Sequence, residues 1–348
     1  MSEQSKIAIS VVVLNYNGAQ WIERCIASVF EQTFQEIELI VADNFSTDGS
    51  DKLAENALRG SANARFIQHG RNLGYCEGNN RAVTQSRGEY IFLLNNDAWL
   101  ERDCLEKLIS EVRRTGAAAA TPYVMNWDDD GPQRAFASGF DIFGLPSFKP
   151  VPAQTEEIFM PGGCSYFIRR DLFLELGGLD PVIFMYGDEW DLSWKLWVTG
   201  HRAVVVPSAR IHHRGAVNVN PAGGEKVVEF RTSDTKRFYA NRNALLVLLK
   251  NCENILLVLV VFQLALLFLE MMAALILVRR WSFVSKSYLA AFRDLFRLAP
   301  HIRAERTKLA KLRKRSDIYM LRFLRWRPNR WDEVVQVARL GFPQVSPK

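Results

Sequence analysis

Residues 7–18 have the sequence IAISVVVLNYNG, in which a mostly apolar run leads into two asparagines, a tyrosine and a glycine. Short β-branched runs that end at turn-forming residues are typical of buried strands. The pattern returns at residues 37–42 (IELIVA), before Asp43, and at residues 90–94 (YIFLL), before Asn95. We therefore predict strands at 7–14, 37–42 and 90–94, each followed by polar residues.

Helical patterns separate these strands. Residues 19–31 repeat apolar side chains at helical spacing, and further helices are expected near 49–58 and 77–86, with another strand near 65–68. This alternation predicts an α/β fold whose mostly parallel central sheet is covered on both faces. Ligands of such sheets bind beyond the carboxyl ends of the strands.

The second half of the chain is less regular. Residues 123–158 are rich in Gly, Pro and Asp and indicate loops with short strands, whereas 171–176 and 189–199 have helical patterns and 202–206 (RAVVV) indicates a strand. Residues 255–278 are apolar except for Gln263 and Glu270, and about 20 apolar residues suffice to span a bilayer. We predict a first domain over residues 1–250 and a C-terminal helical, membrane-associated region over residues 251–348.

Charge is distributed unevenly along the chain. Residues 279–315 hold twelve Lys or Arg and two acids, a net charge of +10, so the remaining residues carry −4 of the total +6. A basic segment directly after an apolar one favours anionic lipid headgroups over nucleic acid as its partner. Five scattered cysteines without a CxxC pair argue against a zinc site or a disulfide framework and fit a reducing compartment.

Polar residues at the strand ends are candidates for ligand binding. Asp43 can accept a hydrogen bond from the N3–H of a uracil or thymine ring, and Asn15, Tyr16 and Ser46 lie in the same pair of motifs. An ordinary turn and helix cap at residues 46–49 is the alternative. The loop 71–80 (RNLGYCEGNN) can bring backbone N–H groups towards a ligand, through Asn72, Gly74 and Asn79. Neither a GxGxxG nor a Walker pattern is present at these positions.

Three carboxylates lie within four residues of the segment 185–196 (MYGDEWDLSWKL). A helix N-terminus favours acids, which accounts for one or two of them. With a second polar site upstream at Asn95, Asn96 and Asp97, the cluster suggests a general base and a site for a divalent cation with hard oxygen ligands.

These motifs together resemble the family 2 glycosyltransferases of GT-A fold over about residues 7–250. The segments that carry the resemblance occur in the family's order: VVVLNYNG, VADNFSTDGS, NLGYCEGNN, LLNNDA, PGGCSYFIRR, GGLDPVIFMYGDEWDLSWKL and IHHRG. The bacterial rhamnosyltransferase-like branch, which often has a membrane-associated C-terminal part with a basic tail, is the more similar one.

The resemblance implies roles for individual residues. Asp43 corresponds to the acid that binds the base, and Asn95 and Asp97 occupy the two ends of the Asp-X-Asp-like site, with Asn95 in place of the first Asp. Asp97 is then the main metal ligand and His213 the second, with His212 or a purely structural histidine as alternatives. Gly162 and Gly163 correspond to the loop that shapes the donor-sugar and acceptor pocket.

The acidic segment departs from the family pattern. The family usually has Glu-Asp-X-Asp where this chain has Asp188, Glu189, Trp190 and Asp191. Glu189 holds the position of the general base, and Asp188 remains the alternative because the order of the pair is reversed. Trp190 and Asp191 continue this side of the site, and Asp191 shares a helix face with Asp188, so a structural cap is its other interpretation.

The resemblance implies transfer of a sugar, with inversion, from a nucleotide diphosphate donor to a hydroxyl of a glycan or polyprenyl-diphosphate-linked acceptor, assisted by Mg²⁺ or Mn²⁺. dTDP-rhamnose is the expected donor, with UDP-hexoses or UDP-GlcNAc as alternatives, and a homo-oligomer is left open. A non-catalytic sugar- or lipid-binding scaffold and a nucleotidyltransferase are the competing functions.

The apolar segment raises a question of topology. Nucleotide sugars are cytosolic, so a single span at 255–278 places the basic tail outside, against the positive-inside tendency. We therefore expect peripheral or monotopic attachment to the cytoplasmic face of the plasma membrane through residues 255–315. A buried helix or a dimer interface is the alternative.

Overall fold

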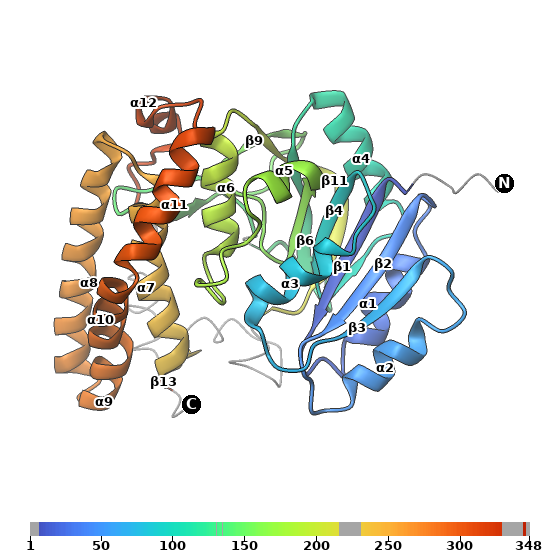
Figure 1. Cartoon of the computed structure of the whole chain (residues 1–348), viewed down its shortest axis with the longest axis horizontal. Helices are drawn as coiled ribbons and strands as arrows, with labels where there is room; N and C mark the ends of the chain where they lie inside the picture. The colour runs from blue at the N-terminus through green and yellow to red at the C-terminus, as the bar shows by residue number, and fades with distance from the viewer. Residues whose placement is uncertain (1–6, 130, 134, 216–230, 329–343, 346–348) are drawn as a thin grey trace. The chain divides into compact units, whose positions relative to one another are not determined.

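The computed structural model describes residues 7–129, 131–133, 135–215, 231–328 and 344–345. Within these residues a nine-stranded sheet has the order β3-β2-β1-β4-β10-β6-β11-β5, with β9 also paired to β11 (Figure 1). The strands are β1 (Ile9–Asn15), β2 (Ile37–Asp43), β3 (Ala64–Gln68), β4 (Tyr90–Asn95), β5 (Ala98–Leu100), β6 (Ala119–Asn126), β9 (Glu156–Ile158), β10 (Ser165–Arg169) and β11 (Ala203–His213).

Most of these strands run in one direction. β1 pairs in parallel with β2 and β4, β2 with β3, and β11 with β6. β10 lies antiparallel between β4 and β6, so β6 and β11 keep the direction of the first four strands. β5 and β9 are antiparallel additions to β11. The predicted α/β fold with a mostly parallel central sheet is confirmed.

Helices cover both faces of the sheet. Alternate strand residues such as Val11, Val13 and Phe92 form one core with α1 (Ile22–Phe30), α2 (Ser50–Ala57) and α4 (Cys104–Thr115). Because side chains alternate across a strand, Leu14 points to the opposite face. There it packs against α3 (Gly74–Thr84), where a Cβ on Gly78 would lie 2.7 Å from the Leu14 side chain.

The sequence-based elements differ from the observed ones mainly at their ends. Strand 202–206 continues as β11 to His213, across an irregular register between Val206 and Arg210 that contains Pro207. The helices predicted at 171–176 and 189–199 are α5 (Arg170–Glu175) and α6 (Asp188–Val198). The elements that the sequence did not predict include α4, β5, β6 and β10. β6 begins in alanines and contains Pro122, so neighbouring strands rather than local propensity determine it.

The chain divides into two compact units. The first comprises residues 1–137, 149–193 and 201–215, and the second comprises 138–148, 194–200 and 216–348. Short strands β7 (Ala137–Phe140) and β8 (Pro146–Phe148) pair with each other, as do β12 (Arg231–Thr232) and β13 (Gln344–Val345). The domain boundary at residue 250 stays a prediction.

Helices dominate the second unit. They are α7 (Asp234–Asn251), a 3₁₀ turn η2 (Ile255–Leu257), α8 (Val258–Leu277), α9 (Trp281–Val284), the π-helical η3 (Ser285–Leu289), α10 (Ala290–Arg297), α11 (Ala299–Leu312), α12 (Asp317–Met320) and η4 (Leu321–Phe323). Ile255–Leu277 is long and apolar enough to cross a membrane. The basic segment at 279–315 forms α9 to α11, and residues 329–343 and 346–348 of the predicted C-terminal region lie outside the described residues.

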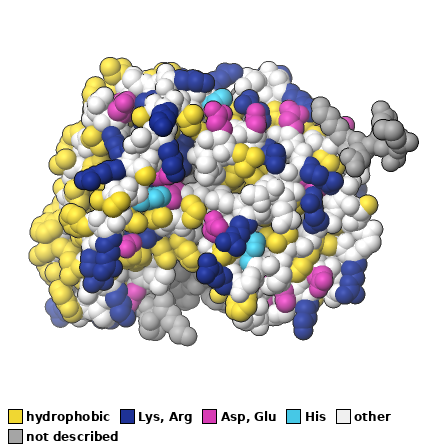
Figure 2. Space-filling view, in the orientation of Figure 1, with side chains coloured by type: hydrophobic (Ala, Val, Ile, Leu, Met, Phe, Trp, Pro, Cys, Tyr) yellow, Lys and Arg dark blue, Asp and Glu magenta, His cyan; other side chains and the backbone are white. Residues whose placement is uncertain are grey.

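One side of α8 is packed and the other is open. The polar residues of α8 lie on the packed side, where Gln263 is fully buried and Glu270 lies 3.7 Å from Arg237 of α7. The open side is apolar, with Val261, Leu269 and Ile276 each more than 60% exposed. Figure 2 shows hydrophobic side chains gathered over α8. This arrangement differs from a helix that lipid surrounds on all sides.

A buried carboxylate joins three segments of the first unit. Glu38 of β2 is 1% exposed and accepts hydrogen bonds from Ser10 Oγ at 2.5 Å, Arg87 N at 2.5 Å and Arg65 Nη2 at 2.7 Å. Burial by itself raises the pKa of Glu38, but these hydrogen bonds outweigh it and hold the pKa below its ordinary value. Glu38 therefore stabilises the fold in its ionised form.

We expect Glu38→Gln to lower the free energy of unfolding near neutral pH by about 2 kcal/mol, since it leaves two partly exposed arginines without their carboxylate. The depressed pKa means that this contribution exists above the unfolded pKa of about 4.3 and is lost as pH falls below it. In urea unfolding, the free energies of unfolding of the wild type and of Glu38→Gln should converge at acid pH. The exposed control Glu36→Gln should match the wild type, and a constant Glu38 effect at all pH values would contradict the prediction.

Candidate active site

Three strand ends lie side by side at one edge of the sheet. The register pairs Asn15 with Asp43 and Leu14 with Asn95. The buried Asn15 amide donates to Asp43 Oδ1 at 2.8 Å and to Ser50 Oγ at 2.9 Å, and its oxygen accepts from Asn96 Nδ2 at 2.9 Å. Asn15 thus connects the loops that follow β1, β2 and β4.

Asp43 is fully buried, and both of its oxygens are engaged. Oδ1 accepts from Asn15 and from Ser46 Oγ at 2.6 Å, while Oδ2 accepts from Gln68 Nε2 at 2.9 Å and from the backbone of Phe45 and Ser46. A nucleobase N3–H would have to replace one of these donors. The base-binding role of Asp43 stays a prediction, and its observed role is to hold the loop after β2.

Two aromatic rings are exposed at this edge. Tyr16, after β1, is 44% exposed, and Phe45, after Asp43, is 53% exposed with a positive φ of 72°. Exposed rings can stack on a planar base. Phe45 was not singled out from the sequence, although a large apolar side chain inside a polar turn motif was a signal that could have identified it.

The loop before α3 holds itself in place through its asparagines. Asn72 Oδ1 accepts from Gly74 N at 2.8 Å and from Asn44 Nδ2 at 2.9 Å, and the buried Asn79 donates to the Tyr75 carbonyl at 2.9 Å. Gly74 has φ +77°, and a Cβ there would lie 2.4 Å from the Phe184 ring. These contacts explain why the loop needs these residues, and donor binding by them stays a prediction.

The end of β11 brings a histidine to the loop after β4. Because β11 pairs with β5 so that His213 is opposite Ala98, His213 Nε2 lies 3.4 Å from Asp97 Oδ1 and 3.4 Å from Asn95 Nδ2. Gly215 N donates to Asp97 Oδ2 at 3.2 Å, and Gln133 Oε1 lies 3.0 Å from His213 Nδ1. The structure therefore brings together the residues proposed as metal ligands.

Asp97 and His213 shift each other's protonation. Burial raises the pKa of Asp97, but the charge of His213 and its hydrogen bond outweigh this and lower it. Burial lowers the pKa of His213, but interactions with Cys164 and Asp97 raise it well above its ordinary value. The neighbouring His212 instead stacks on Trp99 at a centroid distance of 3.8 Å and contacts the Asn126 carbonyl through Nδ1, which is a structural environment.

The pair has the donor set of a divalent cation site. A carboxylate oxygen and an imidazole nitrogen 3.4 Å apart can occupy neighbouring positions around one Mn²⁺ or Mg²⁺ ion. Within the described part of the chain no group of three or more His, Cys, Asp or Glu residues is placed to hold a metal. Two protein ligands suit an ion that takes its remaining ligands from phosphate oxygens and water.

Asp188 and Glu189 begin α6 and face each other as a coupled pair. Burial and then the charge of Glu189 raise the pKa of Asp188 well above its ordinary value. Burial also raises the pKa of Glu189, but a hydrogen bond with Asp188 opposes the shift. Both carboxyls of the pair therefore hold a proton more tightly than a free acid does. Trp190 and Asp191 are buried at 4% and 1% exposure, so they support the helix rather than line a surface.

The segment 162–164 lies beside both the Asp188–Glu189 pair and His213. A Cβ on Gly163 would lie 3.2 Å from the Glu189 carboxyl carbon, and Tyr75 donates to the Gly163 carbonyl at 2.9 Å. The next residue, Cys164, lies close enough to His213 to raise the pKa of that ring, and its carbonyl accepts a hydrogen bond from Asn95 N at 3.0 Å. Gly163 leaves room for Glu189, and the neighbouring Cys164 lies beside His213.

Residues 10–177 match the model of the family described as Glycosyl transferase family 2. This match covers just under half of the chain and agrees with the family that its motifs resemble. It is similar to an N-acetylglucosaminyl-diphospho-decaprenol L-rhamnosyltransferase of Mycobacterium tuberculosis, with 26% identity over 245 residues, 60% of this chain and 76% of that protein. It is also 28% identical over 135 residues to Glycosyltransferase GlyG of Streptococcus pneumoniae, a match that covers 38% of this chain and less than half (45%) of that relative.

Solved structures share the fold. TarS of S. aureus in complex with UDP has a TM-score of 0.54 at 16% identity over 88% of both chains. GalNAc-T7 with UDP, GalNAc and Mn²⁺ has a TM-score of 0.53 at 19% identity, over 59% of this chain and 43% of that one. At these identities the likeness shows the GT-A fold alone.

The Asp97–His213 pair gives a direct test of the site's electrostatics. We expect Asp97→Asn to lower the pKa of His213, because it removes a neighbouring carboxylate while the burial of the ring remains. An NMR titration of the His213 ring without added metal measures this change. Glu101→Gln, which alters a carboxylate 3.8 Å from His212, is the matched control and should leave His213 unchanged. A His213 pKa that is the same in Asp97→Asn would show that the pair is not coupled.

Proposed function

We propose that this protein is an inverting glycosyltransferase that moves a sugar from a nucleotide diphosphate donor to an acceptor hydroxyl. The observation that carries the proposal is that segment 162–164 lies beside both Glu189 and His213, the residue paired with Asp97. A base and a site for a diphosphate-bound cation are thereby held by adjacent residues. The family 2 domain supports the same reaction class.

Asp97 and His213 would hold Mg²⁺ or Mn²⁺, which supplies Lewis-acid stabilisation of the leaving diphosphate. His213 has to be neutral to act as a ligand, so its proton leaves when the ion binds. The Gln133 contact at Nδ1 orients the ring so that Nε2 points towards Asp97.

The donor's base would lie at the edge formed by β1 and β2. Tyr16 and Phe45 offer exposed rings for stacking, and the Asn15 network fixes the loops beneath them. Direct recognition of N3–H by Asp43 would require displacement of one of the protein donors, of which the Gln68 amide at 2.9 Å comes from a separate strand.

Glu189 would accept the proton of the acceptor hydroxyl as the new glycosidic bond forms. The bond between the sugar and the diphosphate breaks on the opposite face, and the leaving oxygen keeps the electron pair, so the anomeric configuration is inverted. In this scheme Asp188 would carry a proton and donate a hydrogen bond that holds the Glu189 carboxylate and opposes the rise in its pKa. Segment 162–164 would limit access of water to the donor sugar.

The donor sugar and the acceptor are proposals that rest on relatives. The mycobacterial relative is named as an L-rhamnosyltransferase acting on a diphospho-decaprenol lipid, which favours dTDP-rhamnose and a polyprenyl-linked acceptor. The two structural neighbours contain UDP, which supports a UDP-sugar as the alternative donor. A lipid-linked acceptor also fits attachment to the cytoplasmic membrane face through the exposed apolar side of α8.

Separate substitutions of Glu189 and Asp188 distinguish the proposed base from its neighbour. A thermal-shift screen of nucleotide sugars with Mn²⁺ first identifies the donor, since a ligand that binds the folded state raises its stability. With that donor, we expect Glu189→Gln to slow transfer by about 10²-fold or more while donor binding stays unchanged. Asp188→Asn should keep measurable transfer, because an amide can still donate a hydrogen bond to Glu189.

Release of nucleoside diphosphate in the presence of a membrane extract measures transfer. Near-normal turnover in Glu189→Gln would remove Glu189 from the mechanism. Loss of turnover in Asp188→Asn alone would reassign the base to Asp188.

A further inference from the structure

A cavity of about 240 Å³ lies in the helical unit, between the end of α7, its connection to α8 and the second half of α11. It far exceeds the roughly 10–15 Å³ that one water needs by the same kind of measure. Its lining residues are Lys250, Cys252, Glu253, Arg306, Thr307, Leu309, Ala310 and Arg313. Three of them are cations and one is an acid, so the cavity carries a net positive charge.

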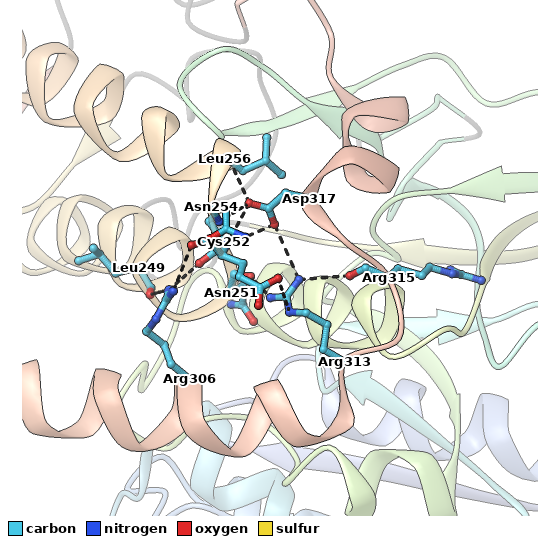
Figure 3. Close-up of polar contacts among 10 residues, drawn as sticks. Leu249, Asn251, Cys252, Asn254, Leu256, Arg306, Arg313, Arg315 and Asp317 are labelled. Atoms are coloured by element: carbon cyan, nitrogen blue, oxygen red, sulfur yellow. Dashed lines mark hydrogen bonds and ion pairs between the residues drawn. The ribbon is translucent and has the colours of Figure 1, made fainter.

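The arginines are held in place by backbone carbonyls. Arg306 Nη1 donates to the Leu249 carbonyl at 2.6 Å and to the Cys252 carbonyl at 2.5 Å, and Arg313 Nη2 donates to the Asn251 carbonyl at 2.5 Å (Figure 3). Figure 3 shows both side chains reaching from the α11 side to the end of α7. Because their rotamers are already fixed, binding an anion costs these side chains little further entropy.

Arg306 retains the capacity to pair with an anion. Across the described residues, no carboxylate lies within ion-pair distance of it, and its hydrogen bonds go to backbone carbonyls. A guanidinium has five N–H donors and matches phosphate oxygens in pairs. The charge of Arg313 is partly neutralised by two carboxylates, Glu253 at 3.6 Å and Asp317 at 3.7 Å. Arg306 is therefore the cation best suited to an incoming anion.

The backbone donors at the start of the apolar helix are already satisfied. Asp317 Oδ2 accepts from the backbone N–H groups of Glu253, Asn254 and Leu256 at 2.8 to 3.1 Å. This carboxylate fixes the connection between α7 and α8, which forms one wall of the cavity. An anion in the cavity thus meets side-chain cations in a fixed frame rather than free helix N–H groups.

Exposed apolar surface begins directly beside the cavity. Ile255 is 53% exposed and Val258 is 46% exposed, and Ile255 follows the lining residue Glu253 by two positions, at most about 7 Å of chain. The open side of α8 continues the apolar surface beyond them. A ligand with a phosphate at one end and hydrocarbon at the other matches this order of charged cavity and apolar helix.

We propose that this cavity binds the phosphate headgroup of a membrane lipid whose hydrocarbon chains lie against the open side of α8. The inference rests on the proposed membrane attachment and not on sugar transfer. It makes the residues that line the cavity a headgroup-binding site rather than part of a general basic surface.

Two matched substitutions on α11 test the proposal in the full-length protein. Ala310 lines the cavity and Ala304 does not, both are exposed, and each Ala→Glu change alters the net charge equally. We expect Ala310→Glu to weaken binding to phosphatidylcholine vesicles that contain phosphatidic acid about tenfold more than Ala304→Glu, as measured by flotation. Glycerol 3-phosphate should compete for the wild type, and vesicles of phosphatidylcholine alone should bind weakly.

Equal losses in the two variants would overturn the proposal, because they would indicate general surface attraction. Stabilisation of the wild type by inorganic phosphate, lost in Ala310→Glu while vesicle binding stays equal, would also overturn it in favour of a soluble anion. If Ala310→Glu melts at a lower temperature than the wild type, Thr307→Glu is used as the test variant in its place, because it puts the same charge in the cavity. Nucleotide binding by the same variants separates failure of this proposal from failure of the proposed glycosyl transfer.

Discussion

The in-register pairing of β1 with β2 and with β4 is the constraint on which the rest of the site depends. It places Asn15 beside Asp43 and Leu14 beside Asn95, so the three following loops leave the sheet at one edge. A shift of one residue in either pairing would turn these side chains to the other face of the sheet. Asn15 then joins the loops through two buried hydrogen bonds and one part-buried one, and the low dielectric of the interior strengthens the buried pair.

The second half of the site comes from segments far away in sequence. β11 continues past Pro207 and carries His213 to Asp97, while β10 follows the segment 162–164 that contacts Glu189 and His213. The two buried acids at 188–189 behave as one titrating unit because a single proton satisfies both. Their order, reversed relative to the family pattern, is compatible with Glu189 as the base, since Asp188 is the more deeply buried of the two.

Local pattern predicted much of the fold and part of the site. The β-branched runs before Asn15, Asp43 and Asn95 gave three parallel strands, because each segment carries its own strand signal. β6, with Ala119 and Pro122, carries no such signal and forms only because β10 and β11 flank it. Likewise, motif comparison grouped Asp97 with His213. It could not show that both carboxylate oxygens of Asp43 already accept hydrogen bonds, or that Cys164 lies beside His213. Those facts depend on side-chain packing between distant segments, as does the cavity beside Arg306.

The central claim is that the edge formed by β1, β2 and β4 holds a nucleoside diphosphate through a cation on Asp97 and His213. A crystal structure of the protein with UDP and Mn²⁺ tests it most directly. The account predicts the pyrimidine ring against Tyr16 or Phe45, with Asp97 and His213 Nε2 in the metal's coordination sphere and Glu189 open on the acceptor side. A nucleotide bound away from this edge, or a metal ion that touches neither Asp97 nor His213, would contradict it.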